Sequence, residues 1–241
     1  MTHVAHPFIQ RLGINRDWRS RWFAANPKQF REYLKTDAAI RKLITKKLKG
    51  MSVDAVEIER NDSTLRVLIK SSRPGLVIGR SGEGATKLRK DIDMLLRTLK
   101  LEEKPEIKID IEEVRSPESS AAIVGQMVAE GLEKRMPFRR VLKQTVEKVM
   151  ANRDVQGVRI IVSGRLGGAD MARREELKKG RIPLQTLRAD IDFARVRATL
   201  PYGVIGIKVW IYRGDVFEDR RAARSTNTES NVSAHTPPTL N

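Results

Sequence analysis

The 241-residue sequence contains 47 Lys and Arg residues against 30 Asp and Glu residues, a formal net charge of +17 at pH 7. Like charges at this density repel one another in the folded state, so the excess favours a polyanionic partner over a merely solvated surface. The chain has no cysteine, which excludes disulfides and thiolate chemistry, and it lacks an apolar run approaching the ~18 residues that span a bilayer.

Residues 1–36 look like an extension with little regular structure, and the first domain is expected over 37–115. Asp37 is a candidate N-cap for a helix that runs to Lys49 and stops at Gly50. Alternation of apolar and charged residues predicts strands, and helical spacing of leucines predicts a helix. The expected elements are strands at 53–60, 65–70 and 107–112, a short apolar turn at 76–78, and a helix from Glu83 to about Leu101.

A second domain is expected over 116–215, after a boundary at Ser116 and Pro117. It begins with two helices that Pro137 divides, because proline removes a backbone donor. Two helices packed on a mostly antiparallel sheet give an α+β domain. The expected elements are helices at 119–136 and 138–151, a strand at 158–162, a Gly- and Arg-rich connection at 164–180, apolar alternation at 182–193 and a strand at 204–212. The tail, 216–241, is expected to be disordered because it is poor in large apolar residues.

The tetrapeptide at 79–82 is the most informative short motif. Its two glycines allow the backbone to approach a phosphodiester chain, and the following helix N-terminus favours anions. The motif joins two helices and precedes basic residues, which matches the loop of a KH domain; a plain turn is the alternative. The candidate RNA-binding residues of this loop and its flank are Gly79, Arg80, Ser81, Gly82, Lys87, Arg89 and Lys90.

Catalytic and metal-binding patterns are not apparent, so we expect no enzyme activity, cofactor or small-molecule substrate. Gly79 and Gly84 have the spacing of P-loop glycines, but Ala85 stands where the P-loop lysine is required. Asp190 and Asp192 could mimic paired catalytic acids, but they are more simply solvent-facing or arginine-paired. The histidines all lie in terminal segments expected to be disordered: His3, His6 and His235.

A second candidate RNA contact lies around Pro137. Helical spacing places Phe138, Leu142 and Val149 on a buried stripe, with Arg139 and Lys143 on the opposite side. Like charges at this spacing repel unless an anion neutralises them, and a solvated helix face is the alternative. The residues of this second cluster are Lys134, Arg135, Arg139, Arg140 and Lys143.

A third candidate contact is the Gly- and Arg-rich connection after residue 163. Glycines flanking Arg165 allow close approach of the backbone to folded RNA, although a flexible glycine loop would look the same. The candidate residues are Arg165, Gly167, Gly168, Arg173, Arg174, Lys178 and Lys179.

Several long segments resemble the family of bacterial-type small-subunit ribosomal protein number three. They are 73–82, 138–140, 163–170, 180–192 and 202–210. The resemblance implies a type II KH domain, with a three-stranded mixed sheet and helices on one face. It also implies that a second α+β domain follows, with two helices on a mostly antiparallel sheet.

The same resemblance implies a function in translation. Members of this family bind small-subunit ribosomal RNA in the head of the subunit, beside head proteins numbers ten and fourteen. They also line the place where messenger RNA enters, and the helix with Arg139, Arg140 and Lys143 is implied to grip and help unwind the message. A cytoplasmic ribosome is expected, with an organelle ribosome as an alternative and no membrane partner. The rival interpretations are a free KH-domain RNA-binding regulator and a metal-dependent enzyme using Asp190 and Asp192.

Overall fold

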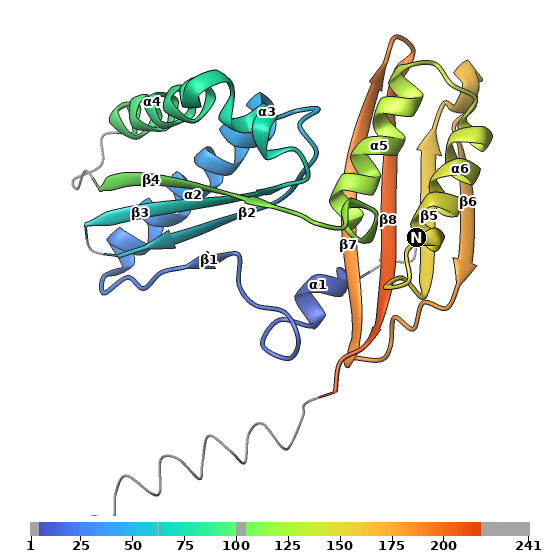
Figure 1. The fold of residues 1–241 in the computed structure, drawn as a ribbon, viewed down its shortest axis with the longest axis horizontal. Coiled ribbons are helices and arrows are strands. Elements are labelled where there is room, and N and C mark those ends of the chain that lie inside the picture. Colours follow the sequence, from blue (N-terminus) through green and yellow to red (C-terminus); the bar gives the residue numbers. More distant parts are fainter. Residues whose placement is uncertain (1–4, 62, 100–104, 218–241) are drawn as a thin grey trace, which may run out of the picture.

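The computed structural model describes residues 5–61, 63–99 and 105–217, which form two α+β units lying side by side (Figure 1). The first unit has a four-stranded sheet in the order β1-β2-β3-β4, in which only the β2–β3 pair is antiparallel. Its elements are β1 (Ser20–Arg21), α2 (Pro27–Lys47), β2 (Val53–Arg60), β3 (Thr64–Ser71), α3 (Pro74–Ile78), a 3-10 turn (Arg80–Gly82), α4 (Glu83–Thr98) and β4 (Glu106–Glu113).

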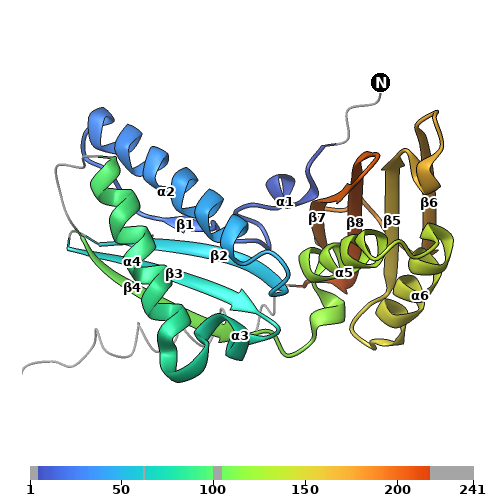
Figure 2. The same ribbon diagram turned by 90° about the horizontal axis from the view of Figure 1, so that it is seen from above.

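All three helices of this unit cover the same face of the sheet (Figure 2). On β3, Leu65, Val67 and Ile69 point into the core under the helices, whereas Arg66 and Lys70 lie on the open face. The expected strands and the helix from Glu83 are therefore confirmed, because period-two alternation separates a buried face from a charged one. Leu101, the expected end of that helix, lies outside the described residues.

The first helix and the strand count differ from the sequence prediction. Helix α2 begins at Pro27, ten residues before Asp37, because a proline at the first helical position is well suited to start a helix. Asp37 is buried in mid-helix, where it forms an ion pair with Arg60 at 2.7 Å and accepts a hydrogen bond from Trp22 Nε1 at 2.8 Å. The sheet has four strands rather than three, since the two-residue β1 is too short to produce an alternation pattern.

The second unit has an antiparallel sheet in the order β6-β5-β8-β7, and two helices cover one face of it (Figure 2). Strand β6 lies inside the segment expected to be a connection. It escaped prediction because it is an edge strand with charged residues on both faces. The elements are a 3-10 turn (Pro117–Ser119), α5 (Ala121–Glu133), α6 (Phe138–Ala151), β5 (Gly157–Gly164), a 3-10 turn (Leu166–Gly168), β6 (Arg173–Gly180), β7 (Ala189–Leu200) and β8 (Gly203–Asp215).

Both faces of the second sheet carry buried residues. Ile205, Ile207 and Ile211 pack with the inner sides of α5 and α6, as their alternation predicts. On the other face the rings of Phe193 and Trp210 pack at a tilt, 4.9 Å between centroids, in a smaller apolar cluster.

The N-terminal segment connects the two units. Helix α1 (Pro7–Gln10) lies against β7 of the second unit, and β1 then joins the sheet of the first (Figure 1). Between them Arg11 is fully buried, and its guanidinium donates to the carbonyl oxygens of Ala189 at 2.6 Å, Thr186 at 2.9 Å and Leu184 at 3.2 Å. The extension expected to lack regular structure is thus folded onto both units.

His6 belongs to the same segment and is packed rather than disordered. Its ring meets that of Phe193 edge-on at 4.7 Å, and burial lowers its pKa. His3, His235 and nearly all of the expected disordered tail lie outside the described residues. Within the part of the chain that the structure describes, no helix is both long and apolar enough to cross a bilayer.

Candidate nucleic-acid interface

The tetrapeptide at 79–82 forms an exposed turn between α3 and α4. Gly79 and Gly82 have φ values of 73° and 78°, in the left-handed region that glycine adopts without a steric penalty. Ser81 adopts a φ of 50° between them, and both Arg80 and Ser81 are exposed. The turn therefore presents its backbone to solvent at the start of α4, in the position that an anion-binding loop requires.

A third glycine, Gly84, holds this turn in place and was not recognised from the sequence as part of the motif. A Cβ atom there would lie 2.4 Å from the carbonyl oxygen of Val77 and 2.8 Å from that of Ile78. The C-terminal end of α3 thus packs directly against the backbone of the first turn of α4. The signal in the sequence is Gly84 itself, which together with Gly79 matched only the glycine spacing of an incomplete P-loop.

The basic flank on α4 is exposed, but acids accompany it. Lys87, Arg89 and Lys90 are all exposed, as expected for residues that contact RNA. Lys87 lies 3.8 Å from Glu83, one helical turn earlier. The structure therefore leaves Arg89 and Lys90 as the unpaired cations of this flank among the described residues.

The second basic cluster lies where α5 ends and α6 begins. Lys134 and Arg135 follow α5, and Arg135 has a φ of 59°, which is unusual for a residue with a side chain. On α6, Arg139, Arg140 and Lys143 are exposed. The opposite side of α6 is inserted into the core, as helical spacing predicts, through Leu142, Thr145 and Val149.

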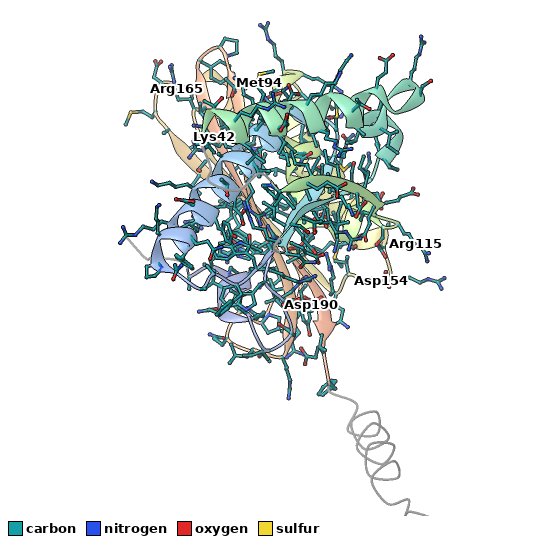
Figure 3. All side chains as sticks on the ribbon, turned by 90° about the vertical axis from the view of Figure 1, so that its left-hand side faces the viewer. Lys42, Met94, Arg115, Asp154, Arg165 and Asp190 are labelled. Atoms are coloured by element: carbon teal, nitrogen blue, oxygen red, sulfur yellow. The ribbon has the colours of Figure 1, made fainter. Side chains whose placement is uncertain are left out.

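The third set of residues is divided among different surfaces. Arg165 donates to the carbonyl oxygen of Ala169 at 2.9 Å and pairs with Asp170 at 3.0 Å, so its guanidinium braces its own loop. Gly167 and Gly168 belong to the 3-10 turn beside it. This loop lies at one end of the second sheet, and Asp190, which is discussed below, lies at the other end (Figure 3).

Strand β6 holds the remaining four cations of that set. Alternation along the strand places Arg173 and Lys179 on the side of α6, and Arg174 and Lys178 on the other side. They therefore do not form one patch.

One aromatic ring joins the second cluster to strand β6. The guanidinium carbons of Arg139 and Arg173 lie 5.6 Å and 5.2 Å from the centre of the Phe138 ring. Arg139 also lies 3.7 Å from Glu175. Sequence spacing could not reveal this contact, because the two arginines are far apart in the chain and meet only through the packing of α6 on β6.

The two aspartates considered as catalytic acids have structural roles. Asp192 is buried, accepts a hydrogen bond from the backbone N–H of Ala121 at 2.8 Å, and pairs with Arg213 at 3.2 Å. Asp190 pairs with Arg16. The described residues include no group of three or more His, Cys, Asp or Glu residues that could hold a metal ion.

Comparison with known proteins identifies both halves of the chain. Residues 39–119 match the family described as KH domain, and residues 128–211 match Ribosomal protein S3, C-terminal domain. Three similar proteins, each named Small ribosomal subunit protein uS3, come from Caldicellulosiruptor bescii, Xanthomonas euvesicatoria and Alcanivorax borkumensis. They are 45%, 42% and 45% identical to the chain over 92%, 95% and 90% of its length, and over 97%, 91% and 90% of their own.

Proposed function

The chain belongs to the family of small ribosomal subunit protein uS3 and is therefore a structural, non-enzymatic protein of the small subunit. We propose the surfaces through which it binds RNA in that subunit. It binds small-subunit ribosomal RNA in the head and lines the place where messenger RNA enters. Its net charge of +17 supports a surface devoted to RNA, because phosphate contacts supply much of the affinity of such complexes. The cytoplasmic ribosome is its proposed location.

The message-binding surface that we propose is the basic cluster on α6. The observation that carries it is the exposure of Arg139, Arg140 and Lys143 opposite a buried apolar stripe. Arg140 and Lys143 have no ion pair among the described residues and are available to phosphates, whereas Arg139 lies 3.7 Å from Glu175 and would have to exchange that contact for a phosphate. The buried stripe fixes the direction in which all three side chains point. Arg173 extends the cluster across the Phe138 ring onto strand β6.

Grip by these cations would help to separate the strands of a structured message. Holding the incoming strand by its phosphates opposes reannealing, and translocation by the ribosome supplies the work. This role requires no nucleotide-binding site in the chain, in agreement with the alanine that replaces the P-loop lysine at position 85.

The loop at 79–82 is proposed as a contact with the RNA backbone. The exposed turn, its two left-handed glycines and the neighbouring Arg89 and Lys90 support this role. The neighbouring head proteins, numbers ten and fourteen, are proposed as protein partners by family analogy.

Replacing Arg139, Arg140 and Lys143 together by Ala tests the message-binding role. Alanine retains helix propensity, and the side chains lie outside the core, so assembly should be nearly unaffected. Ribosomes with this variant should translate unstructured message almost normally and slow on a message with a stable duplex just ahead of the ribosome. The control replaces Arg66, Lys70 and Lys108 by Ala, which removes the same charge from the open face of the first sheet. Equal rates on both messages would refute the proposed grip, and failure to assemble would show that the cluster binds ribosomal RNA.

A further inference from the structure

Helix α2 carries a line of cations that lies outside the three basic regions described above. At 3.6 residues per turn, Arg31, Lys35, Lys42 and Lys46 fall within about 60° of one another around the helix axis. The line spans about 22 Å along the helix at 1.5 Å per residue. All four side chains are exposed, and the buried residues Ile40 and Ile44 lie on the opposite side. We call these four residues the α2 stripe; Lys42 is labelled in Figure 3.

The α2 stripe has no acidic partner within the described residues. In that part of the chain no ion pair joins any of its four cations to a carboxylate, and the two acids of the helix, Glu32 and Asp37, lie off the stripe. Asp37 is buried and neutralised by Arg60. Within the stripe the spacing of four residues occurs twice, between Arg31 and Lys35 and between Lys42 and Lys46, and it places like charges beside each other.

The neighbouring helix α4 offsets part of its positive charge with acids, although Arg89 and Lys90 stay unpaired among the described residues. On α4, Arg97 pairs with Asp93 at 2.6 Å, Lys87 lies 3.8 Å from Glu83, and Asp91 pairs with Lys47 of α2. Acids thus neutralise cations within α4 and at the contact between α4 and α2. The stripe lacks that compensation, so a bound polyanion would relieve its repulsion.

The open face of the first sheet gives a second contrast. Four cations lie on it, and each of them has a carboxylate within 4.0 Å. Arg21 lies 2.8 Å from Glu59, and Lys70 lies 2.8 Å from Glu57. The excess positive charge of the first unit is therefore concentrated on its helical side. The remaining cations of this face, Arg66 and Lys108, pair with Asp110 and Glu106.

The stripe continues toward the basic cluster of the second unit. Lys49, just beyond the end of α2, lies 3.2 Å from Glu133, the last residue of α5. Lys134 and Arg135 follow immediately in the chain. The end of α2 therefore adjoins the end of α5, where the second basic cluster begins.

We propose that the α2 stripe binds the phosphodiester backbone of RNA, as a contact separate from the loop at 79–82 and continuous with the cluster at the α5–α6 junction. The inference rests on the proposed RNA-binding function. Its ligand is a run of phosphates bound without regard to base sequence, because the four stripe residues are all cations. Ribosomal RNA and the incoming message share this chemistry.

The first test replaces Arg31, Lys35, Lys42 and Lys46 together by Gln in the full-length protein. The matched control replaces Arg21, Arg66, Lys70 and Lys108 by Gln, which removes the same charge from the open sheet face. Binding to an oligouridylate is measured over a salt series. The stripe variant should lower the slope of log K against log salt by about 0.7 for each phosphate that it no longer neutralises, and the control by much less. Equal slopes for the two variants would overturn the proposal.

The second test locates the contact in the assembled subunit. The chain has no cysteine, so Ala38→Cys, an exposed position in the middle of the stripe, accepts a single short photo-cross-linker. Lys108→Cys on the open sheet face is the matched control. Cross-links from position 38 to ribosomal RNA or to message support the stripe and tell the two sources apart. Subunits that contain the labelled protein but give no RNA cross-link at position 38 above the control would overturn it. Failure of the unmodified protein to enter subunits would instead refute the proposed function.

Discussion

Replacing Arg11 by Met should destabilise the second unit strongly, although Arg11 belongs to none of the proposed RNA contacts. The guanidinium is fully buried and donates to the carbonyl oxygens of Leu184, Thr186 and Ala189, and to that of Pro7 at 3.0 Å. Methionine preserves much of the aliphatic stem but leaves these carbonyls without their donor. A hydrogen bond from a charged group contributes about 1.5–3 kcal/mol, and burial of unpaired carbonyls adds to the loss. We expect a decrease of about 3–5 kcal/mol in the free energy of unfolding of this unit.

Hydrogen exchange and urea unfolding measure this effect. Exchange should accelerate most at the amides of β7 and of the segment before it, because Arg11 ties that segment to α1. Arg188→Met is the matched control, since Arg188 is exposed and its pair with Asp215 should contribute at most about 1 kcal/mol. Equal, small losses for the two variants would refute the view that Arg11 holds the N-terminal segment in place.

Two further predictions concern the loop and the boundary between the units. Gly84→Ala should displace α3 from α4 and weaken RNA binding by the loop. The control is Gly75→Ala, which has open space around the added Cβ and should leave RNA binding unchanged. Similar RNA affinities for the two variants would refute the role of Gly84. Burial raises the pKa of Asp54, which accepts a hydrogen bond from Ser120. The folded state thus retains this proton to higher pH than the unfolded chain, so stability falls as pH rises from the pKa of the unfolded chain to the raised pKa of the folded state. Urea unfolding should show Asp54→Asn gaining stability relative to the parent protein as pH rises above about 4, and a difference in the free energy of unfolding that does not change with pH would contradict this.

The sequence predicts well those elements that alternate or repeat over a long run. Strand β8 and helix α6 follow their patterns of apolar residues closely, and the exposed side of α6 could be predicted from spacing alone. The turn at 79–82 was recognisable because its glycines are required by local backbone conformation. In these cases the determining interactions lie within a few residues of one another.

Features that depend on distant partners could not be predicted in the same way. Strand β1 exists because it pairs with β2, and β6 because it pairs with β5, although neither has an alternating sequence. Likewise Arg165, expected to face RNA, is engaged by Asp170 and Ala169, and the opposite sides of β6 divide a set of cations that are neighbours in the sequence. Only the packing of the whole chain determines which cations remain free.

Co-sedimentation of the native protein with small ribosomal subunits in about 1 M salt tests the central claim most directly. At this ionic strength the Debye length is about 3 Å, so nonspecific binding through exposed charges is screened, whereas contacts buried in a specific assembly are retained. We predict that the protein remains in the small-subunit fraction in constant proportion to ribosomal RNA. Its release to the top of the gradient, with small subunits otherwise intact, would contradict its place as a structural protein of the subunit and would favour a free RNA-binding regulator.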